Sequence, residues 1–261
     1  MFPGNHILTE QTMHRKTSPA VFVFFALVGC FAFAAHAATS PAVSAAKAGS
    51  ANQGRRQEYI KVMEAARRDA PAFLALIPEG RESGFGFGNH QEIAGAIIGD
   101  AYQVLTLSPE FIQGEPVPAG KELVEAGEWW VTVRNGERNA LVMIVALVES
   151  DWQVVAMGMT NQAMELASFE KSSKDRQENI QILRIYTLQA DFILSVPAGG
   201  FPTPDGDLSV PDGGSVKGAR TPDTKVYPMM TARKAFPGAL EKSAFSLDEL
   251  LQWLRIQFMQ L

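Results

Sequence analysis

Residues Trp129–Gly158, WWVTVRNGERNALVMIVALVESDWQVVAMG, decide the fold. Two β-rich runs flank Asn135-Gly136, a dipeptide typical of tight hairpins because both residues tolerate the positive φ of a type I′ turn. The second run, Asn139–Val148, is apolar at every position after its first residue. A polar turn at Glu149-Ser150-Asp151 then leads into a third run, Trp152–Met157. The stretch therefore predicts a three-stranded antiparallel meander.

The middle run of this meander determines what surrounds it. A strand that is apolar on both faces is expected to have helices on both faces, or a helix on one face and an oligomer contact on the other. A buried helix is the competing interpretation of Asn139–Val148. The hairpin signal and the β-branched residues favour the strand. We therefore expect an α+β fold with one antiparallel sheet of about five strands and helices packed on it. Cystatin-like, PepSY-like and NTF2-like arrangements meet this description by analogy only.

Further strands and helices are expected on both sides of the meander. Ala101–Leu107 has strand composition. Ile180–Val196 is either one long strand or two strands that meet near Gln189-Ala190, and we favour one strand with a bulge because neither Gly nor Pro interrupts it. Gly84–Gly88 predicts a loop that places two Phe rings in the core, followed by a helix from His90 to Ile98. Another helix is expected from about Thr160 to Ser168.

Two amphipathic helices are expected near the ends of the domain. Gln57–Arg68 has an apolar face, and Asp69-Ala70-Pro71 predicts a break and a restart. Ser246-Leu247-Asp248-Glu249 is a capping box that begins a C-terminal helix with an apolar stripe. Trp253 and Ile256 fall off that stripe. Either this helix has two buried surfaces, or these two residues form a partner surface.

The N-terminus has the composition of a targeting segment. Residues 1–37 combine a basic start at Met13–Lys16, an apolar run, and the small-x-small sequence Ala35-His36-Ala37 of a signal peptidase site. The alternative is a lipoprotein signal ending before Cys30, which would then be lipidated. Both interpretations predict export to the periplasm or the extracellular space. Met1 and Met13 are both candidate start residues.

The remaining chain is expected to form one domain. Residues 38–54 are rich in Ala, Ser and Gly and predict a flexible tether. Residues 55–261 then form a single α+β domain, with a long loop at 197–228 that is rich in Gly, Pro and Asp. The whole chain has 261 residues, 46% of them hydrophobic, which is enough for a substantial core.

Composition excludes several chemistries. Without residues 1–37 the chain has no cysteine and one histidine, His90, so thiol nucleophiles and multi-histidine metal sites are excluded. No phosphate-loop or dinucleotide-binding motif is present, and we predict no cofactor or metal. A net charge of −5 argues against nucleic acid as a partner. The carboxylates Glu122, Glu125 and Glu128, at a spacing of three, are the remaining candidates for hydrolysis.

Four features occur together in this chain: Gly99–Leu107, Trp130, Asn135-Gly136 and Asp151–Gly158. With them, about Gly84–Val196 resembles a group of exported bacterial proteins of unknown function. Those proteins tend to have a G-x-P-Y-x-V-Y-T-I-like strand followed by a hairpin that ends in W-x-V-V-x-x-G. Here Ala101 replaces the usual proline and Leu105 the usual tyrosine. The resemblance implies a fold and an envelope location, and no catalytic residue.

The functional prediction is an exported, non-catalytic binding or interaction protein of the bacterial cell envelope. Its partner would be an envelope protein or a small ligand, and it would meet the membrane only through the N-terminal signal or a lipid anchor. Two alternatives remain open: a secreted hydrolase that uses carboxylates of Glu122–Glu128, and an inhibitor or propeptide-like domain.

Overall fold

The computed structural model describes residues 44–173, 178–197, 223–238 and 242–259, with side chains from Gly54 onward. The described residues belong to one compact unit. The predicted signal segment at 1–37, Cys30 within it, and most of the predicted loop at 197–228 lie outside the described residues.

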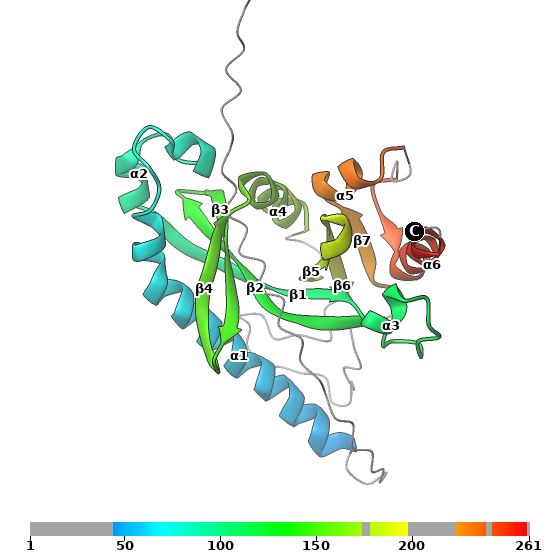
Figure 1. Cartoon of the computed structure of the whole chain (residues 1–261). Coiled ribbons are helices and arrows are strands. Elements are labelled where there is room, and N and C mark those ends of the chain that lie inside the picture. The colour runs from blue at the N-terminus through cyan, green and yellow to red at the C-terminus, as the bar shows by residue number, and fades with distance from the viewer. Residues whose placement is uncertain (1–43, 174–177, 198–222, 239–241, 260–261) are drawn as a thin grey trace, which may run out of the picture. The chain divides into compact units, whose positions relative to one another are not determined.

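One sheet dominates the described part of the chain (Figure 1). Its eight strands follow the order β4-β3-β2-β1-β5-β6-β7-β8, so the prediction of about five strands was too low, whereas the α+β class is confirmed. All neighbouring pairs are antiparallel except β1 and β5, which place Val104 beside Ile182. The strands are β1 (Ile97–Leu107), β2 (Leu123–Asn135), β3 (Arg138–Val148), β4 (Asp151–Gly158), β5 (Glu178–Ile185), β6 (Ala190–Pro197), β7 (Lys225–Pro228) and β8 (Phe245–Ser246).

The predicted meander is confirmed as β2, β3 and β4, but its turns differ from the prediction. Asn135 ends β2 opposite Arg138, so Gly136 is the first central residue of the turn, with a φ of 61°. A glycine in this place is typical of a type II′ turn rather than type I′. The turn with two positive φ values is the next one, at Glu149 (49°) and Ser150 (74°).

The favoured single strand at 180–196 is wrong, and the alternative of two strands that meet near Gln189-Ala190 is confirmed. β5 and β6 are separated by a short 3₁₀ helix, η4 (Tyr186–Leu188), and by Gln189 in the left-handed region with a φ of 50°. A glutamine is a rare residue for this conformation, so the composition gave no turn signal.

Six α-helices lie around the sheet in the described residues. α1 begins at Ser44, inside the stretch predicted as a tether, and continues through Pro71 without the predicted break. Buried Ala70 and Leu74 extend its apolar face past the proline. α2 ends before Gly95, earlier than predicted, because Ile97 already starts β1. The helices are α1 (Ser44–Leu74), α2 (His90–Ala94), α3 (Pro109–Ile112), α4 (Thr160–Ser173), α5 (Met230–Ala235) and α6 (Leu247–Phe258).

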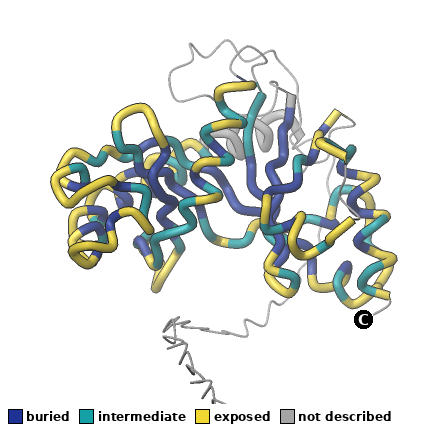
Figure 2. The backbone as a smooth tube through the Cα atoms, turned by 90° about the horizontal axis from the view of Figure 1, so that it is seen from above, coloured by how far each residue is buried: buried dark blue, intermediate teal, exposed yellow. Residues whose placement is uncertain are grey.

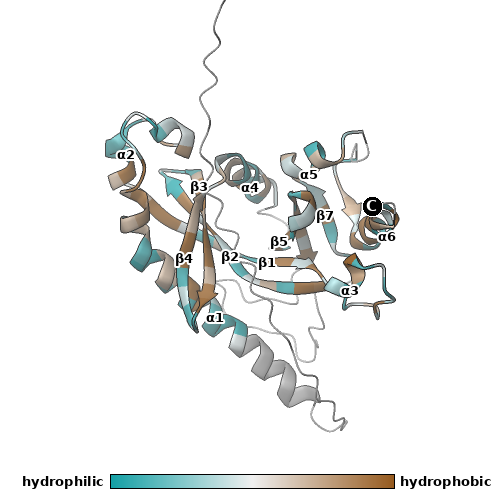
Figure 3. Cartoon of the chain, viewed as in Figure 1, coloured by the Kyte–Doolittle hydropathy of each residue, from teal (hydrophilic) through white to brown (hydrophobic). Residues whose placement is uncertain are grey.

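Both faces of the meander are covered, as predicted. On one face, α1 places Val62 and Ala66 in a buried cluster with Met143 and Val145 of β3. On the other face, Leu166 of α4 lies in a cluster with Trp130, Val142 and Ile182. A third cluster joins α3 and α6 to β5, β6 and β7. Figure 2 shows buried residues along the strands and exposed ones on turns and outer helix faces, and Figure 3 shows that β3 is largely hydrophobic.

Several local predictions are confirmed. Phe87 is buried and Phe85 half-buried, so the glycine-rich loop does place both rings in the core. Asn89 caps α2 by accepting a hydrogen bond from the Glu92 N–H. Ser246 and Glu249 form the predicted capping box of α6, whose stripe buries Leu247, Leu250, Leu251 and Leu254.

Candidate functional site

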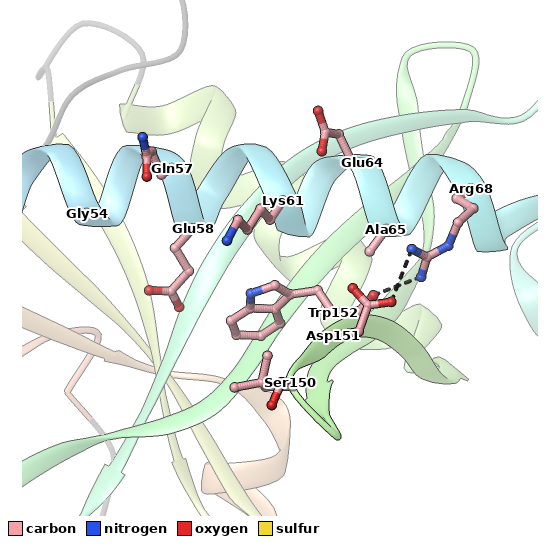
Figure 4. Close-up of a pocket in the computed structure, with 11 residues that line it drawn as sticks. Gly54, Gln57, Glu58, Lys61, Glu64, Ala65, Arg68, Ser150, Asp151 and Trp152 are labelled. Atoms are coloured by element: carbon pink, nitrogen blue, oxygen red, sulfur yellow. Dashed lines mark hydrogen bonds and ion pairs between the residues drawn. The ribbon is translucent and has the colours of Figure 1, made fainter.

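A hollow of about 520 Å³ lies between α1 and the turn that joins β3 to β4 (Figure 4). Its volume falls within the range of ligand sites, but polar and charged side chains form most of its lining, unlike the mainly apolar lining of small-molecule pockets. Trp152, Leu147 and Ala65 are the apolar side chains in it. The other lining residues are Gly54, Gln57, Glu58, Lys61, Glu64, Arg68, Ser150 and Asp151.

On the α1 side of the hollow, some charged side chains have a hydrogen-bond partner and others have none. Glu58 points toward the hairpin in Figure 4 and accepts a hydrogen bond of 2.9 Å from the Trp129 indole N–H. Lys61 and Glu64, about one and two helical turns further along α1, have no hydrogen-bond or ion-pair partner among the described residues. Gln57 and Glu64 point away from the hairpin in the same view. Two opposite charges are therefore available to a partner along one helix.

The end of α1 is tied to β4, the strand at one edge of the sheet. Arg68 donates two hydrogen bonds to Asp69, of 2.7 and 3.0 Å, and one of 2.8 Å to the backbone oxygen of Trp152. Asp69 in turn accepts the N–H of Val154 at 3.1 Å. Arg68 and Asp69 thus bond the backbone groups of β4 that an additional strand would otherwise bond. They thereby cover the exposed edge of β4. Hydrogen bonding from Arg68 lowers the pKa of Asp69.

The hairpin side of the hollow contains the unusual turn at Glu149-Ser150. Positive φ values cost a non-glycine residue on the order of 1 kcal/mol each. Asp151, directly after this turn, lies 3.7 Å from Arg68 and lines the hollow. The two positive φ values are those of a two-residue hairpin turn, which here is built without glycine or asparagine.

A separate group of charged and polar side chains lies on the face covered by α4, with Asp191 buried, Glu128 and Arg184 half-buried and Tyr186 exposed. We call it the Arg184 cluster; it consists of Glu128, Trp130, Arg184, Tyr186, Asp191 and Thr231. Arg184 and Asp191 are direct cross-strand partners in β5 and β6. The Arg184 guanidinium carbon lies 5.6 Å from the Trp130 ring centroid and 5.3 Å from that of Tyr186, and Nε lies 3.7 Å from Asp191 Oδ1.

Both carboxyl groups of this cluster have raised pKa values. Burial raises the pKa of Glu128, although a hydrogen bond from Tyr186 and the charge of Arg184 partly offset it. Burial also raises the pKa of Asp191 against the opposing effects of Arg184 and Thr231. Burial and the neighbouring Glu128 carboxylate raise the pKa of Tyr186 well above its usual value.

Three buried polar atoms of the cluster have no partner in hydrogen-bonding geometry among the described residues: Trp130 Nε1, Glu128 Oε1 and Asp191 Oδ1. The Trp130 indole nevertheless lies close enough to Glu128 to lower its pKa slightly. Unpartnered buried polar groups are uncommon in native proteins and are costly to keep.

A second cluster on the same face has a similar composition. Tyr102 donates a hydrogen bond to Glu170 of α4, and Arg134 pairs with Asp100. Burial raises the pKa values of both Tyr102 and Glu170. We call it the Arg134 cluster, and it provides a comparison for the Arg184 cluster.

The three candidate carboxylates of the hydrolase prediction do not converge. Glu122 is buried, and its carboxylate accepts the N–H of Gly120 in the preceding loop. Glu125 is exposed and lies 3.8 Å from Arg55. Only Glu128 joins a buried cluster, and its acidic neighbour is Asp191, which sequence reasoning missed. A lone aspartate in the apolar run ADFILSV was the available signal.

The other predicted residues lie apart from both sites. Trp253 is half-buried, with its ring edge-on to Phe236 at 4.5 Å between centroids, and Ile256 is exposed on α6. His90 is exposed at the start of α2, 3.8 Å from Glu82. A partner surface at Trp253 and Ile256 stays a prediction.

Within the described residues, no group of histidine, cysteine, aspartate and glutamate is arranged to hold a metal ion. None of the described helices has the length and apolar composition needed to cross a bilayer. Comparisons with protein-family models, curated proteins and solved structures found no match. The resemblance over Gly84–Val196 therefore stays a prediction.

Proposed function

We propose that this chain is an exported, non-catalytic binding protein of the cell envelope, and that the hollow between α1 and the β3–β4 turn is its contact surface for a protein partner. Export is inferred from residues 1–37, either as a cleaved signal peptide or as a lipoprotein signal ending before Cys30. The observation that supports the surface is the hollow itself, where a tryptophan is surrounded by charges of both signs.

The lining of the hollow favours a protein over a small molecule. Protein interfaces combine an aromatic centre with a polar rim, and Trp152 with Glu58, Lys61 and Arg68 has this arrangement. Two residues of this rim are held in place before binding, since Glu58 is bonded to Trp129 and Arg68 to Trp152. A rigid surface loses less conformational entropy on association.

Photo-cross-linking tests this proposal. A photoreactive amino acid replaces Lys61 in the hollow in one variant and Lys234, exposed on α5, in a control variant. The full chain is produced in exporting cells of its source and irradiated. A discrete cross-linked protein from position 61, absent from position 234, supports the proposal. The same products from both positions, or none from position 61, contradict it.

A second candidate function rests on the Arg184 cluster. Glu128 and Asp191 are two carboxyl groups with raised pKa values, and carboxylate-based hydrolases use such groups for acid–base chemistry. Assays of the purified chain against glycosides and esters, repeated with Glu128→Gln, test it. Activity that Glu128→Gln abolishes supports the hydrolase, and activity that the substitution leaves unchanged excludes Glu128 from the chemistry.

A further inference from the structure

The outer edge of β4, beside the hollow, is closed to a further strand. Arg68 donates to the backbone oxygen of Trp152, and Asp69 accepts the N–H of Val154. Val155 follows directly and has no partner in β3, so a bulge interrupts the strand at this point. Bulges and side chains that cover an edge strand both hinder pairing with another strand. This edge therefore disfavours a partner that binds by adding a strand.

The hollow follows α1 for several turns. On this helix its lining runs from Gly54 to Arg68, which is about 21 Å, or about four turns, at the rise of an α-helix. Its other wall is the end of the β3–β4 hairpin, including Leu147 and Trp152. A helix of about 14 residues has the same length as the α1 wall.

The apolar side chains of the hollow come from both walls and are partly open to water. Leu147 is 53% exposed, and Trp152 is half-buried. Ala65 of α1 also lines the hollow. Apolar area that a partner removes from water stabilises the complex. We therefore expect the partner to have an apolar stripe that faces Leu147 and Trp152.

Charged side chains border these apolar residues on both walls. Glu58, Lys61 and Arg68 lie on α1, and Asp151 lies on the hairpin. Glu58 and Arg68 already have hydrogen-bond partners, whereas Lys61 has none among the described residues. Figure 4 shows Lys61 on the side of α1 that faces Trp152. An acidic residue beside the apolar stripe of the partner is therefore complementary to Lys61.

An apolar stripe with charged residues at its flanks is the pattern of an amphipathic helix. We propose that the partner places such a helix, of about 14 residues, in the hollow, with its apolar stripe on Leu147 and Trp152 and an acidic residue opposite Lys61. The bound helix runs along α1, because the lining of the hollow follows that helix. This inference rests on the proposed function and names the element of the partner that binds there.

Cross-link mapping from two positions measures how the partner runs along α1. A photoreactive amino acid replaces Gly54 in one variant and Lys61 in another. Both residues line the hollow, and a Cβ at Gly54 has nothing within 4 Å. The two positions lie on one face of α1, about 10.5 Å apart along its axis. The full chain is produced in exporting cells of its source and irradiated, and mass spectrometry locates the captured partner residue for each variant.

The spacing of the two captured residues distinguishes a helix from an extended segment. A helix in the hollow is captured at residues about seven positions apart, and an extended segment at residues about three positions apart. The first result supports the proposal. The second overturns it and leaves the proposed function in place, because a partner is still captured in the hollow. No capture from either position contradicts both.

A charge exchange tests the pairing with Lys61. The acidic residue of the captured segment that lies opposite position 61 is replaced with lysine, and isothermal titration measures the binding of this partner to wild type and to Lys61→Glu. We expect the exchange to weaken binding to wild type at least about tenfold and Lys61→Glu to restore most of the lost affinity. A captured segment without an acidic residue there, or an exchange that Lys61→Glu does not restore, overturns the proposed pairing.

Discussion

Arg68 of α1 donates a hydrogen bond of 2.8 Å to the backbone oxygen of Trp152, at the outer edge of β4. With Asp69 it occupies the position where a further strand would pair. This contact holds α1 against the hairpin and forms one wall of the hollow. Arg68 therefore serves both the fold and the proposed surface.

Replacing Arg68 with alanine should destabilise the protein more than replacing its neighbour. Arg67 is exposed and makes no hydrogen bond or ion pair with the described residues, so Arg67→Ala removes a similar side chain without the edge contact. We expect a lower urea midpoint for Arg68→Ala and a near wild-type midpoint for Arg67→Ala. Because the β4 edge becomes exposed, Arg68→Ala should also aggregate more readily in light scattering. Equal midpoints for the two variants would show that the edge contact has no structural role.

Residues that favour positive φ values at positions 149 and 150 should increase the stability of the protein. The double substitution Glu149→Asn with Ser150→Gly supplies Asn-Gly where both φ values are positive. We expect a gain of about 1 kcal/mol in the free energy of unfolding, measured by chemical denaturation. Gly136→Ala is the converse control. It places a side chain at a φ of 61° with nothing within 4 Å of the added Cβ, and should cost about 1 kcal/mol.

Two glycines of the same loop should respond differently to alanine. A Cβ at Gly86 would lie 2.4 Å from the backbone oxygen of Ala140, at a φ of 81°, so that backbone must move. At Gly84, a Cβ has nothing within 4 Å. We expect Gly86→Ala to cost more than about 2 kcal/mol and Gly84→Ala less than about 1 kcal/mol in thermal denaturation. Similar melting temperatures would mean that the loop does not pack on β3 as described.

Stability should be greatest on the acidic side of neutrality. Glu128, Asp191, Glu165 and Glu170 have raised pKa values because of burial, so the stability they contribute is present at low pH and is lost as pH rises through those values. Asp69 has a lowered pKa, so its contribution is lost as pH falls through that lower value. We expect a higher melting temperature at mildly acidic pH than at alkaline pH. A maximum above pH 7 would contradict the burial of these carboxyl groups.

Local patterns were sufficient to predict the meander, the glycine-rich loop and the capping box of α6. Period-two alternation and side-chain capping depend on residues close in sequence, so they can be recognised without coordinates. The turn at Gln189 and the passage of α1 through Pro71 could not be recognised this way. Tertiary contacts decide both, since the Arg68–Asp69 contacts with β4 and the burial of Ala70 and Leu74 support the helix at the proline.

The candidate sites were also hard to predict, because contacts between residues far apart in the sequence form them. Glu128 and Asp191 are far apart in the sequence, and only the parallel contact of β1 with β5 brings their halves of the sheet together. The hollow likewise joins α1 to a turn more than 80 positions later. No motif marks either site, because each is formed by residues from distant elements.

The most direct test of the binding surface is the affinity for the protein captured by cross-linking. Isothermal titration compares wild type with Lys61→Glu and with Lys234→Glu, a matched charge reversal on α5. If the hollow is the contact surface, Lys61→Glu raises Kd at least about tenfold and Lys234→Glu leaves it unchanged. Equal affinities for the three proteins would contradict a binding surface in the hollow.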